Sequence, residues 1–452
     1  MEVVGRQNPG GAETPSEAPK TIRPVAAHAH LRSVPEQDIR LARWRDATVS
    51  RGVARLQGFL YLPKNAWALT STSALWSIGA SMANPYQSVY FASLGASPFE
   101  IGLLVAYGTG VTVIALLLGG YIADTWGRRQ VVITFSWVSV ASALVYCLIG
   151  SPGLLVLPLT LASVASMYTP AFNSIMMDSI EPDDRIRGFA VFTAINTAPS
   201  VFAPTVGGLL IDRFGATPGL RICYLLSGLF GIVGVSVRSL MLKETYTAER
   251  PAAKSFASYF KDPFVEGVGA IRKSGSTVKR LLVYVTLAGI GTGLTSPYVS
   301  IYVVNYLKIN ALSYSLVVDL AGAATVCLLL IVVFLIRRLG SKRSILLASV
   351  AAPLSNVMFT QAKTMDELFE WGVTGAVSTA LQSPSLSVMQ AEAIEQRNRG
   401  KVLAMFSILP TVVSLPSQVF AGFLYSSVSP VVPFVASLLP FGLAAVVLYL
   451  IR

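Results

Sequence analysis

The chain has 452 residues, of which 53% are hydrophobic and only 13% are charged. Soluble domains carry about 25% charged residues, so this composition excludes an ordinary soluble protein. The three cysteines lie in apolar runs and the two histidines precede the first run, which leaves no thiolate metal site and no interior histidine base. The net charge of +12 is dispersed over loops, so we expect no nucleic-acid partner.

Apolar runs long enough to cross a bilayer recur along the chain after the first 65 residues. A spanning helix needs about 20 mostly apolar residues, because the bilayer offers no water to the backbone. The sequence therefore predicts an all-α membrane protein with twelve transmembrane helices. We place these helices at 66–92, 100–122, 130–150, 153–178, 187–211, 219–241, 281–306, 312–337, 342–361, 370–391, 400–425 and 429–451.

These runs divide the chain into four expected parts. Residues 1–65 are rich in Pro, Gly and charged residues, which predicts a largely disordered tail. A six-helix bundle follows at 66–241, then a central loop at 242–280 and a second six-helix bundle at 281–452. Lys and Arg are retained on the cytoplasmic side of membranes. Because most basic residues lie on the side of the tail, we expect both termini and the central loop in the cytoplasm, and the protein in the plasma membrane.

The two predicted bundles repeat each other at a nearly fixed offset. Asn84–Tyr90 (NPYQSVY) matches Ser296–Tyr302 (SPYVSIY), and Arg185–Gly188 (RIRG) matches Arg397–Gly400 (RNRG), both 212 residues further on. A duplicated six-helix unit explains this offset. Parallel repeats of this kind place a solute site near the bilayer midplane and work by rocking one half against the other.

The loop between the second and third helices reads GYIADTWGRR over residues 120–129. It resembles the signature loop of the major facilitator superfamily, a family of transporters, and the resemblance covers residues 66–452. The resemblance implies a twelve-helix transporter similar to the drug exporters, with Asp124 and Arg128 as gate residues. At the matching place in the second half, Arg337 replaces the acid, so that loop cannot form the same gate.

The loop residues also have a physical role of their own. A carboxylate at Asp124 could hold the amino end of a neighbouring helix, and the two arginines could reach an acid at the end of the fourth helix. Alternatively, the arginines only fix the topology. We expect a cytoplasmic gate formed by Asp124, Gly127, Arg128, Arg129, Asp178 and Arg187.

The fifth predicted helix carries an unusual group of prolines and glycines. Its run Ala203–Gly208 is similar to the proline-glycine motif of the family's antiporters, although that motif has glycine where Pro199 and Ala203 stand. Small residues at this spacing permit either a bend or close helix packing, and both remain open. The predicted bend residues are Pro199, Pro204, Gly207 and Gly208.

Asp319 lies about seven residues, roughly 10 Å, inside the eighth predicted helix. A carboxylate inside a membrane is costly, which favours a role in proton coupling or cation attraction. The alternatives are a residue near a wet outer vestibule or one that pairs with a hydroxyl group. Arg221 and Arg238 lie near helix ends, so the sequence predicts no deep positive charge and disfavours an obligately anionic substrate. The family's proton-coupled exporters carry an arginine in the fourth helix, which is absent here, so coupling would rest on Asp319.

Polar and aromatic side chains of several helices are candidates for lining a solute cavity. Each could instead form an interhelical hydrogen bond, and the tyrosines near helix ends could form an interfacial belt. The predicted cavity residues are Asn84, Tyr86, Gln87, Tyr90, Tyr107, Tyr168, Asn173, Asn196, Ser296, Tyr298, Tyr302 and Gln382.

These features together predict a secondary transporter that moves a small solute by alternating access. We expect efflux of a hydrophobic or cationic compound, coupled to protons. The alternatives are uptake of a neutral metabolite, or a non-transporting sensor or scaffold with the same fold. We expect no enzymatic activity, cofactor or metal, and a monomer whose partners are the lipid bilayer and its small-molecule substrate.

Overall fold

The structure is a computed structural model, and it describes residues 61–245 and 256–451. Every regular element in these two stretches is helical, which confirms the predicted all-α class. The predicted tail lies outside the described residues except for residues 61–65.

Three of the predicted helices in the first half of the chain are interrupted. The first breaks at a 3-10 turn that contains Pro85, the fourth breaks around Ser166, and the fifth breaks before Ala203. Pro85 lies in the first positions of the 3-10 turn itself and Pro204 in those of α9, where a missing N–H group is harmless. The elements are α2 Lys64–Ala83, η1 Asn84–Tyr86, α3 Gln87–Ser93, α4 Pro98–Trp126, α5 Arg128–Leu148, η2 Pro152–Leu155, α6 Val156–Ala165, α7 Tyr168–Ser179, η3 Pro182–Asp184, α8 Arg185–Ser200, α9 Ala203–Phe214 and α10 Ala216–Met241.

The second half begins with a helix inside the predicted central loop. This helix, α11, packs against α17, and Glu266 on α11 forms an ion pair with Lys401 on α17 at 2.9 Å. The elements are α11 Phe256–Lys273, α12 Ser276–Thr295, α13 Val299–Ile301, a π-helical turn η4 Tyr302–Tyr306, α14 Ala311–Leu339, α15 Ser341–Gln361, α16 Met365–Ala393, η5 Gln396–Asn398, α17 Arg399–Ser427 and α18 Val432–Tyr449.

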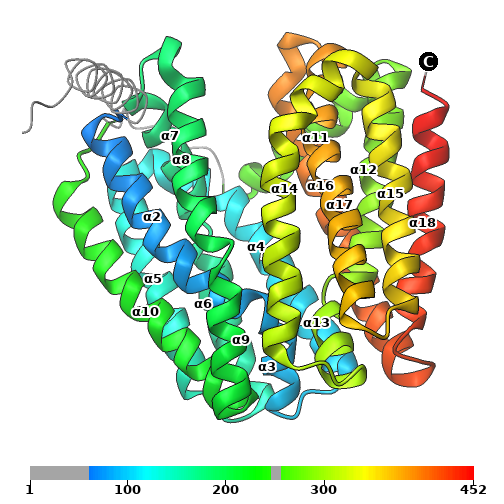
Figure 1. Ribbon diagram of the computed structural model, residues 1–452. Coiled ribbons are helices and arrows are strands. Elements are labelled where there is room, and N and C mark those ends of the chain that lie inside the picture. Colours follow the sequence, from blue (N-terminus) through cyan, green and yellow to red (C-terminus); the bar gives the residue numbers. More distant parts are fainter. Residues whose placement is uncertain (1–60, 246–255, 452) are drawn as a thin grey trace, which may run out of the picture. The chain divides into compact units, whose positions relative to one another are not determined.

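Ten helical segments in the described part of the chain are long and apolar enough to cross a bilayer. Two predicted spans are not among these ten, namely the first, formed by α2 to α3, and the tenth, α16. The amino end of α16 carries Asp366, Glu367 and Glu370, which lower its hydropathy. Both helices nevertheless pack among the apolar segments, α2 against α10 and α16 against α14 and α15, so they belong to the same membrane bundle (Figure 1).

Helix ends in both halves are fixed by local hydrogen bonds and by glycine. Ser97 and Glu100 form a capping box at the start of α4, and Thr364 and Glu367 form a second one at the start of α16. The turns that join α4 to α5 and α14 to α15 each contain a glycine with positive φ, +90° at Gly127 and +85° at Gly340. Other residues adopt this backbone conformation only with strain.

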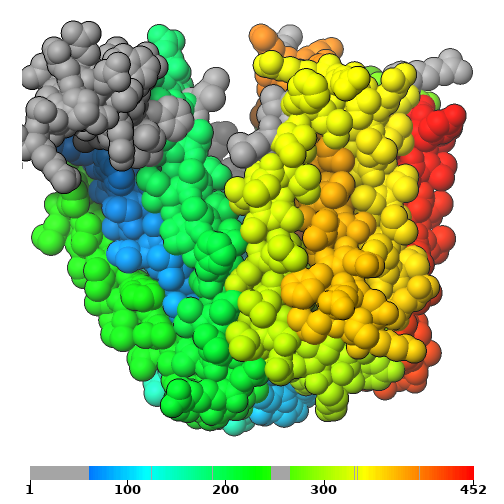
Figure 2. All heavy atoms as spheres, in the orientation of Figure 1, coloured from blue at the N-terminus to red at the C-terminus, as the bar shows by residue number. Residues whose placement is uncertain are grey.

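The two halves of the described chain are joined chiefly through two pairs of helices, with smaller contacts of α13 with α3 and of α11 with α4. Helix α4 packs against α17, and α9 packs against α14. Figure 2 shows α9 (green) in contact with α14 (yellow). One hydrophobic core cluster crosses this junction and contains Tyr86 from the first half together with Tyr298 and Tyr302 from the second.

Candidate functional site

Arg128 and Arg129 begin α5, where they contact the ends of two other helices. Arg128 forms an ion pair with Asp178 near the end of α7, a contact that we expected from the sequence. Arg129 donates from Nε to the Leu242 carbonyl at 2.6 Å and from Nη2 to the Ser239 carbonyl at 2.8 Å. Arg129 therefore caps the carboxyl end of α10, where backbone carbonyls lack helical partners.

The other predicted gate residues lie at the same end of the first half. A Cβ on Gly127 would approach the Glu244 carboxylate to 3.0 Å, so space as well as backbone conformation favours glycine there. Arg187 donates to Asp184 at 2.8 Å, which is a local pair. Asp124 is in the last turn of α4, and its side chain lies outside the described part of the structure. All of these contacts join residues of the first half, so a role of this cluster as a gate stays a prediction.

The opposite end of the bundle is closed by contacts between the two halves. The carboxylate of Asp212 in α9 accepts hydrogen bonds from the backbone N–H groups of Ala311 at 2.9 Å and Leu312 at 3.1 Å. The hydroxyl of Tyr86 donates to the Ala311 carbonyl at 2.8 Å. An acid at the amino end of α14 satisfies N–H groups that have no partner within the helix and complements the helix dipole. We call this contact region the α9–α14 junction.

The predicted bend residues lie in and next to this junction. The chain breaks between α8 and α9, with Pro199 in the last turn of α8 and Pro204 in the first turn of α9. A Cβ on Gly207 would lie 2.1 Å from the Met82 carbonyl, and one on Gly208 would lie 2.8 Å from the Ala311 carbonyl. The segment is therefore interrupted, and its glycines also serve close packing.

Asp319 lies in the same interface, about two turns beyond Ala311 and Leu312 along α14. It is 7% exposed, and one of its carboxylate oxygens, Oδ2, accepts a hydrogen bond from the hydroxyl of Thr205 in α9. The other oxygen, Oδ1, has no hydrogen-bond partner among the described residues. The contact of Asp319 with Thr205 thus joins the two halves of the chain.

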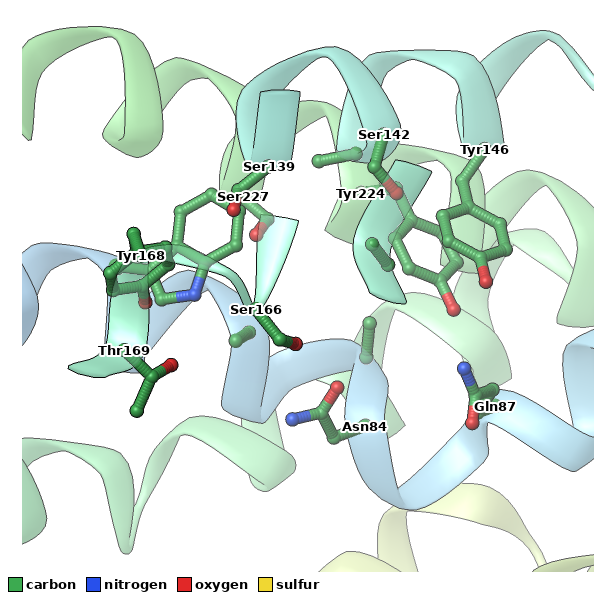
Figure 3. Close-up of a pocket in the computed structure, with 15 residues that line it drawn as sticks. Asn84, Gln87, Ser139, Ser142, Tyr146, Ser166, Tyr168, Thr169, Tyr224 and Ser227 are labelled. Carbon is green, nitrogen blue, oxygen red and sulfur yellow. The ribbon is translucent and has the colours of Figure 1, made fainter. Parts of the chain in front are cut away.

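A pocket of about 250 Å³ lies within the first half, and we call it the first-half pocket. Figure 3 shows Tyr146 and Tyr224 at one end, Ser139, Ser227 and Tyr168 at the other, and Asn84 and Gln87 along one side. The predicted cavity residues Asn84, Gln87 and Tyr168 therefore do line a pocket. The rings of Tyr146 and Tyr224 stack with centroids 4.4 Å apart. Sequence reasoning missed both tyrosines, although polar residues one helical turn away, Ser142 for Tyr146 and Ser227 for Tyr224, line the same pocket and could have marked these helix faces.

A larger pocket of about 570 Å³ lies between the two halves, and we call it the central pocket. Its walls come from α4 and α6 on one side and from α17 on the other, with Thr109, Thr112, Ser407 and Thr411 as polar members. Gln87 lines both this pocket and the first-half pocket. Ala162 also lines both, so the two pockets adjoin at these two residues.

For four predicted cavity tyrosines the structure gives a different location. Tyr86, Tyr90, Tyr298 and Tyr302 are at most 2% exposed, and none of them lines the first-half pocket or the central pocket. In this structure they make the contacts between helices that the sequence left open as the alternative. Tyr90 donates to the Tyr146 carbonyl at 2.5 Å and Tyr298 to the Gln418 carbonyl at 2.7 Å, while Tyr302 packs on Phe359. Each of these rings faces a neighbouring helix.

The remaining predicted cavity residues are scattered. Tyr107 is 39% exposed and bonds the Thr160 hydroxyl at 2.8 Å, and Asn196 donates to its own helix. Gln382 donates to Tyr284 at 3.0 Å and lines a separate pocket in the second half. Asn173 and Ser296 are exposed. None of these five lines the first-half pocket or the central pocket.

Arg238 corrects a second expectation. It lies in the last turn of α10, as expected, but it is only 5% exposed. Its guanidinium donates to the hydroxyls of Thr72 at 2.7 Å, Ser73 at 2.8 Å and Ser136 at 2.8 Å. Nearness to a helix end does not imply exposure, because α2 and α5 cover this face of α10. The first half therefore does contain a buried positive charge.

A family model described as Major Facilitator Superfamily matches residues 69–366. The chain belongs to this superfamily. It is accordingly a multi-pass membrane protein of a transporter family, and the resemblance stated from the signature loop is confirmed.

Several members of the superfamily align with part of the chain. An uncharacterised MFS-type transporter of Methanocaldococcus jannaschii is 22% identical over 54% of this chain and 61% of that protein. The multidrug resistance protein MdtL of Salmonella heidelberg is 29% identical over 37% of this chain and 44% of that protein. A Na(+), Li(+), K(+)/H(+) antiporter of Planococcus maritimus is 27% identical over 50% and 54%, respectively. The chain thus matches less than two thirds of the length of each.

Solved structures of transporters share the fold over most of the chain. The nucleoside transporter NupG gives a TM-score of 0.68 at 15% identity and covers 85% of this chain and 97% of that one. The human organic anion transporter MFSD10 gives 0.61 at 16% identity and covers 85% and 99%. These likenesses establish the superfamily fold.

Proposed function

We propose that this superfamily member is a secondary transporter that moves a small solute by alternating access. The observation that carries this proposal is the central pocket, which takes its walls from both halves while the α9–α14 junction closes one end. Separation of the halves at that junction, with closure at the opposite end, would turn the same pocket toward the other side of the membrane.

We further propose that Asp319 couples this change to protons. An ionised carboxylate that is buried with one oxygen unpaired is costly, and protonation would remove that cost. Because the partner of Asp319, Thr205, lies in the other half of the chain, a change of protonation alters a contact that holds the halves together. Proton uptake and the closed junction are then linked through one side chain.

We propose export rather than uptake, and a hydrophobic solute that carries an aromatic group. The names of two relatives, a multidrug resistance protein and a cation/H(+) antiporter, favour export. Trp76, Tyr146 and Tyr224 in the first-half pocket offer aromatic surfaces. The preference for a cationic solute depended on the absence of a buried positive charge. Arg238 is such a charge, so we no longer prefer a cationic solute. A cytoplasmic location of both termini, the plasma membrane and a monomeric state complete the proposal.

Flux measurements in proteoliposomes test the proposal. Wild type and Asp319→Asn are reconstituted with an internal pH indicator, and aromatic dyes are added with and without a proton gradient. Asp183→Asn is the matched control, since Asp183 is an exposed acid outside the membrane helices. In wild type and in the control we expect dye and protons to cross the membrane in opposite directions. In Asp319→Asn we expect dye movement to be independent of the proton gradient. Unchanged coupling in Asp319→Asn would refute the role of Asp319, and absence of flux with every solute would refute transport.

A further inference from the structure

The partners of Arg238 are unusual for a buried arginine. Among the described side chains, its hydrogen bonds go to three hydroxyl groups, and its guanidinium carbon lies 5.9 Å from the ring centre of Tyr168 and 5.4 Å from that of Phe172. Hydroxyls and rings orient a guanidinium but carry no negative charge. The structure describes no carboxylate that pairs with it.

A buried charge without an opposite charge is costly for a fold. Buried arginines are ordinarily paired with acids, because desolvation of an isolated ion greatly exceeds the gain from neutral partners. Methionine or leucine would join α2, α5 and α10 at lower cost if packing alone were required. The arrangement is more easily explained if the missing negative charge arrives with a ligand.

The surroundings of Arg238 contain room for one ligand atom. A cavity of about 20 Å³, the size of a single water molecule, is lined by Arg238, Thr72 and Ser136. Trp76, Ser139 and Tyr168 line both this cavity and the first-half pocket, so the two spaces adjoin. In Figure 3 the labelled side chains Ser139 and Tyr168 mark the end of the first-half pocket at which they meet.

We propose that Arg238 binds the carboxylate of an aromatic organic acid whose body occupies the first-half pocket. One carboxylate oxygen would take the water-sized cavity beside the guanidinium, and the ring would lie toward the stacked pair Tyr146 and Tyr224. Asn84 and Gln87 on the side of the pocket are left for a neutral polar group. This inference rests on the proposed solute-carrying function and narrows its substrate class to aromatic monocarboxylates.

A pair of probes that differ only in charge tests the inference. The full chain in nanodiscs is titrated calorimetrically with 2-naphthoate and with 2-naphthamide. We expect wild type to bind the carboxylate at least about 10-fold more tightly than the amide, and Arg238→Gln to bind the two within about 2-fold. Arg221→Gln is the matched control: Arg221 lies in the same helix, donates to the Ile149 carbonyl and does not line the pocket, so the preference should persist.

Other outcomes overturn the inference. Equal binding of the two probes by wild type, absence of naphthoate binding, or a preference that survives in Arg238→Gln would each do so. If Arg238→Gln does not fold, Arg238→Lys decides the matter: it keeps the charge but loses the planar fork, so the preference should fall to about 3-fold and not stay at the wild-type level. A separate flux measurement in proteoliposomes tests the proposed function. If the protein binds naphthoate through Arg238 but transports neither probe, the proposed transport is refuted and the inference about Arg238 stands.

Discussion

Substitution of Gly208 by alanine should open the α9–α14 junction. The added Cβ would lie 2.7 Å from the Ser315 hydroxyl and 2.8 Å from both the Ala311 carbonyl and the Leu312 Cα, which is closer than such contacts allow. Two of the three atoms are backbone and cannot rotate away, so the helices must separate. Overpacking of this kind costs about 1–3 kcal/mol. If that cost destabilises only the closed junction, the equilibrium constant for opening the junction rises about 5- to 150-fold.

Amide hydrogen exchange at the start of α14 measures this opening directly. The N–H groups of Ala311 and Leu312 have no acceptor within α14 and are held by Asp212 from the other half. Their exchange rates should therefore rise by the same factor in Gly208→Ala. Gly442→Ala is the control, because a Cβ on Gly442 has no neighbour within 4 Å. Equal exchange in the two variants would show that the junction does not depend on close packing at Gly208.

Two further substitutions test contacts of the loop and the core. Arg129→Ala removes both side-chain hydrogen bonds to the Leu242 and Ser239 carbonyls, so we expect a loss of about 1–3 kcal/mol in the free energy of unfolding, measured by denaturant titration in detergent. A change below 0.5 kcal/mol would mean that water replaces the cap. Tyr298→Phe removes one hydrogen bond to the Gln418 carbonyl and should cost about 1 kcal/mol in the same assay, whereas a neutral effect would imply that another donor reaches that carbonyl.

Hydropathy and length predicted ten of the twelve expected spans, but they did not predict the breaks within three helices or the helix α11. Spans such as α5 and α10 follow their apolar runs closely. The contact of Arg128 with Asp178 was also predictable, since both residues lie at helix ends on the same side of the predicted membrane. The position of a residue along its helix can be counted from the first residue of the helix. Predictions that depend only on this position, such as the contact of Arg128 with Asp178, therefore succeed.

Predictions that depend on which neighbour a helix face meets were less successful. The rings of Tyr86 and Tyr298 turn toward other helices, and nothing in the periodicity of their segments distinguishes a face toward a helix from a face toward a cavity. Arg238 illustrates the same limit. The sequence correctly placed it near the end of its helix, but it did not predict that neighbouring helices bury the side chain. Its three hydroxyl partners come from α2 and α5, which are distant in sequence. Only the packed structure brings them together.

Two of the four positive-φ glycines in the described part of the chain, Gly127 and Gly340, also bear on how the two repeats are related. They occupy matching turns of the two repeats with nearly equal φ, +90° and +85°. Around them the side chains have diverged, for Asp124 precedes the first turn and Arg337 stands at the corresponding place before the second. After a duplication, a residue drifts unless its own copy still needs it. Both copies therefore share the glycine turn that joins their second and third helices, whereas only the first copy carries an acid beside it.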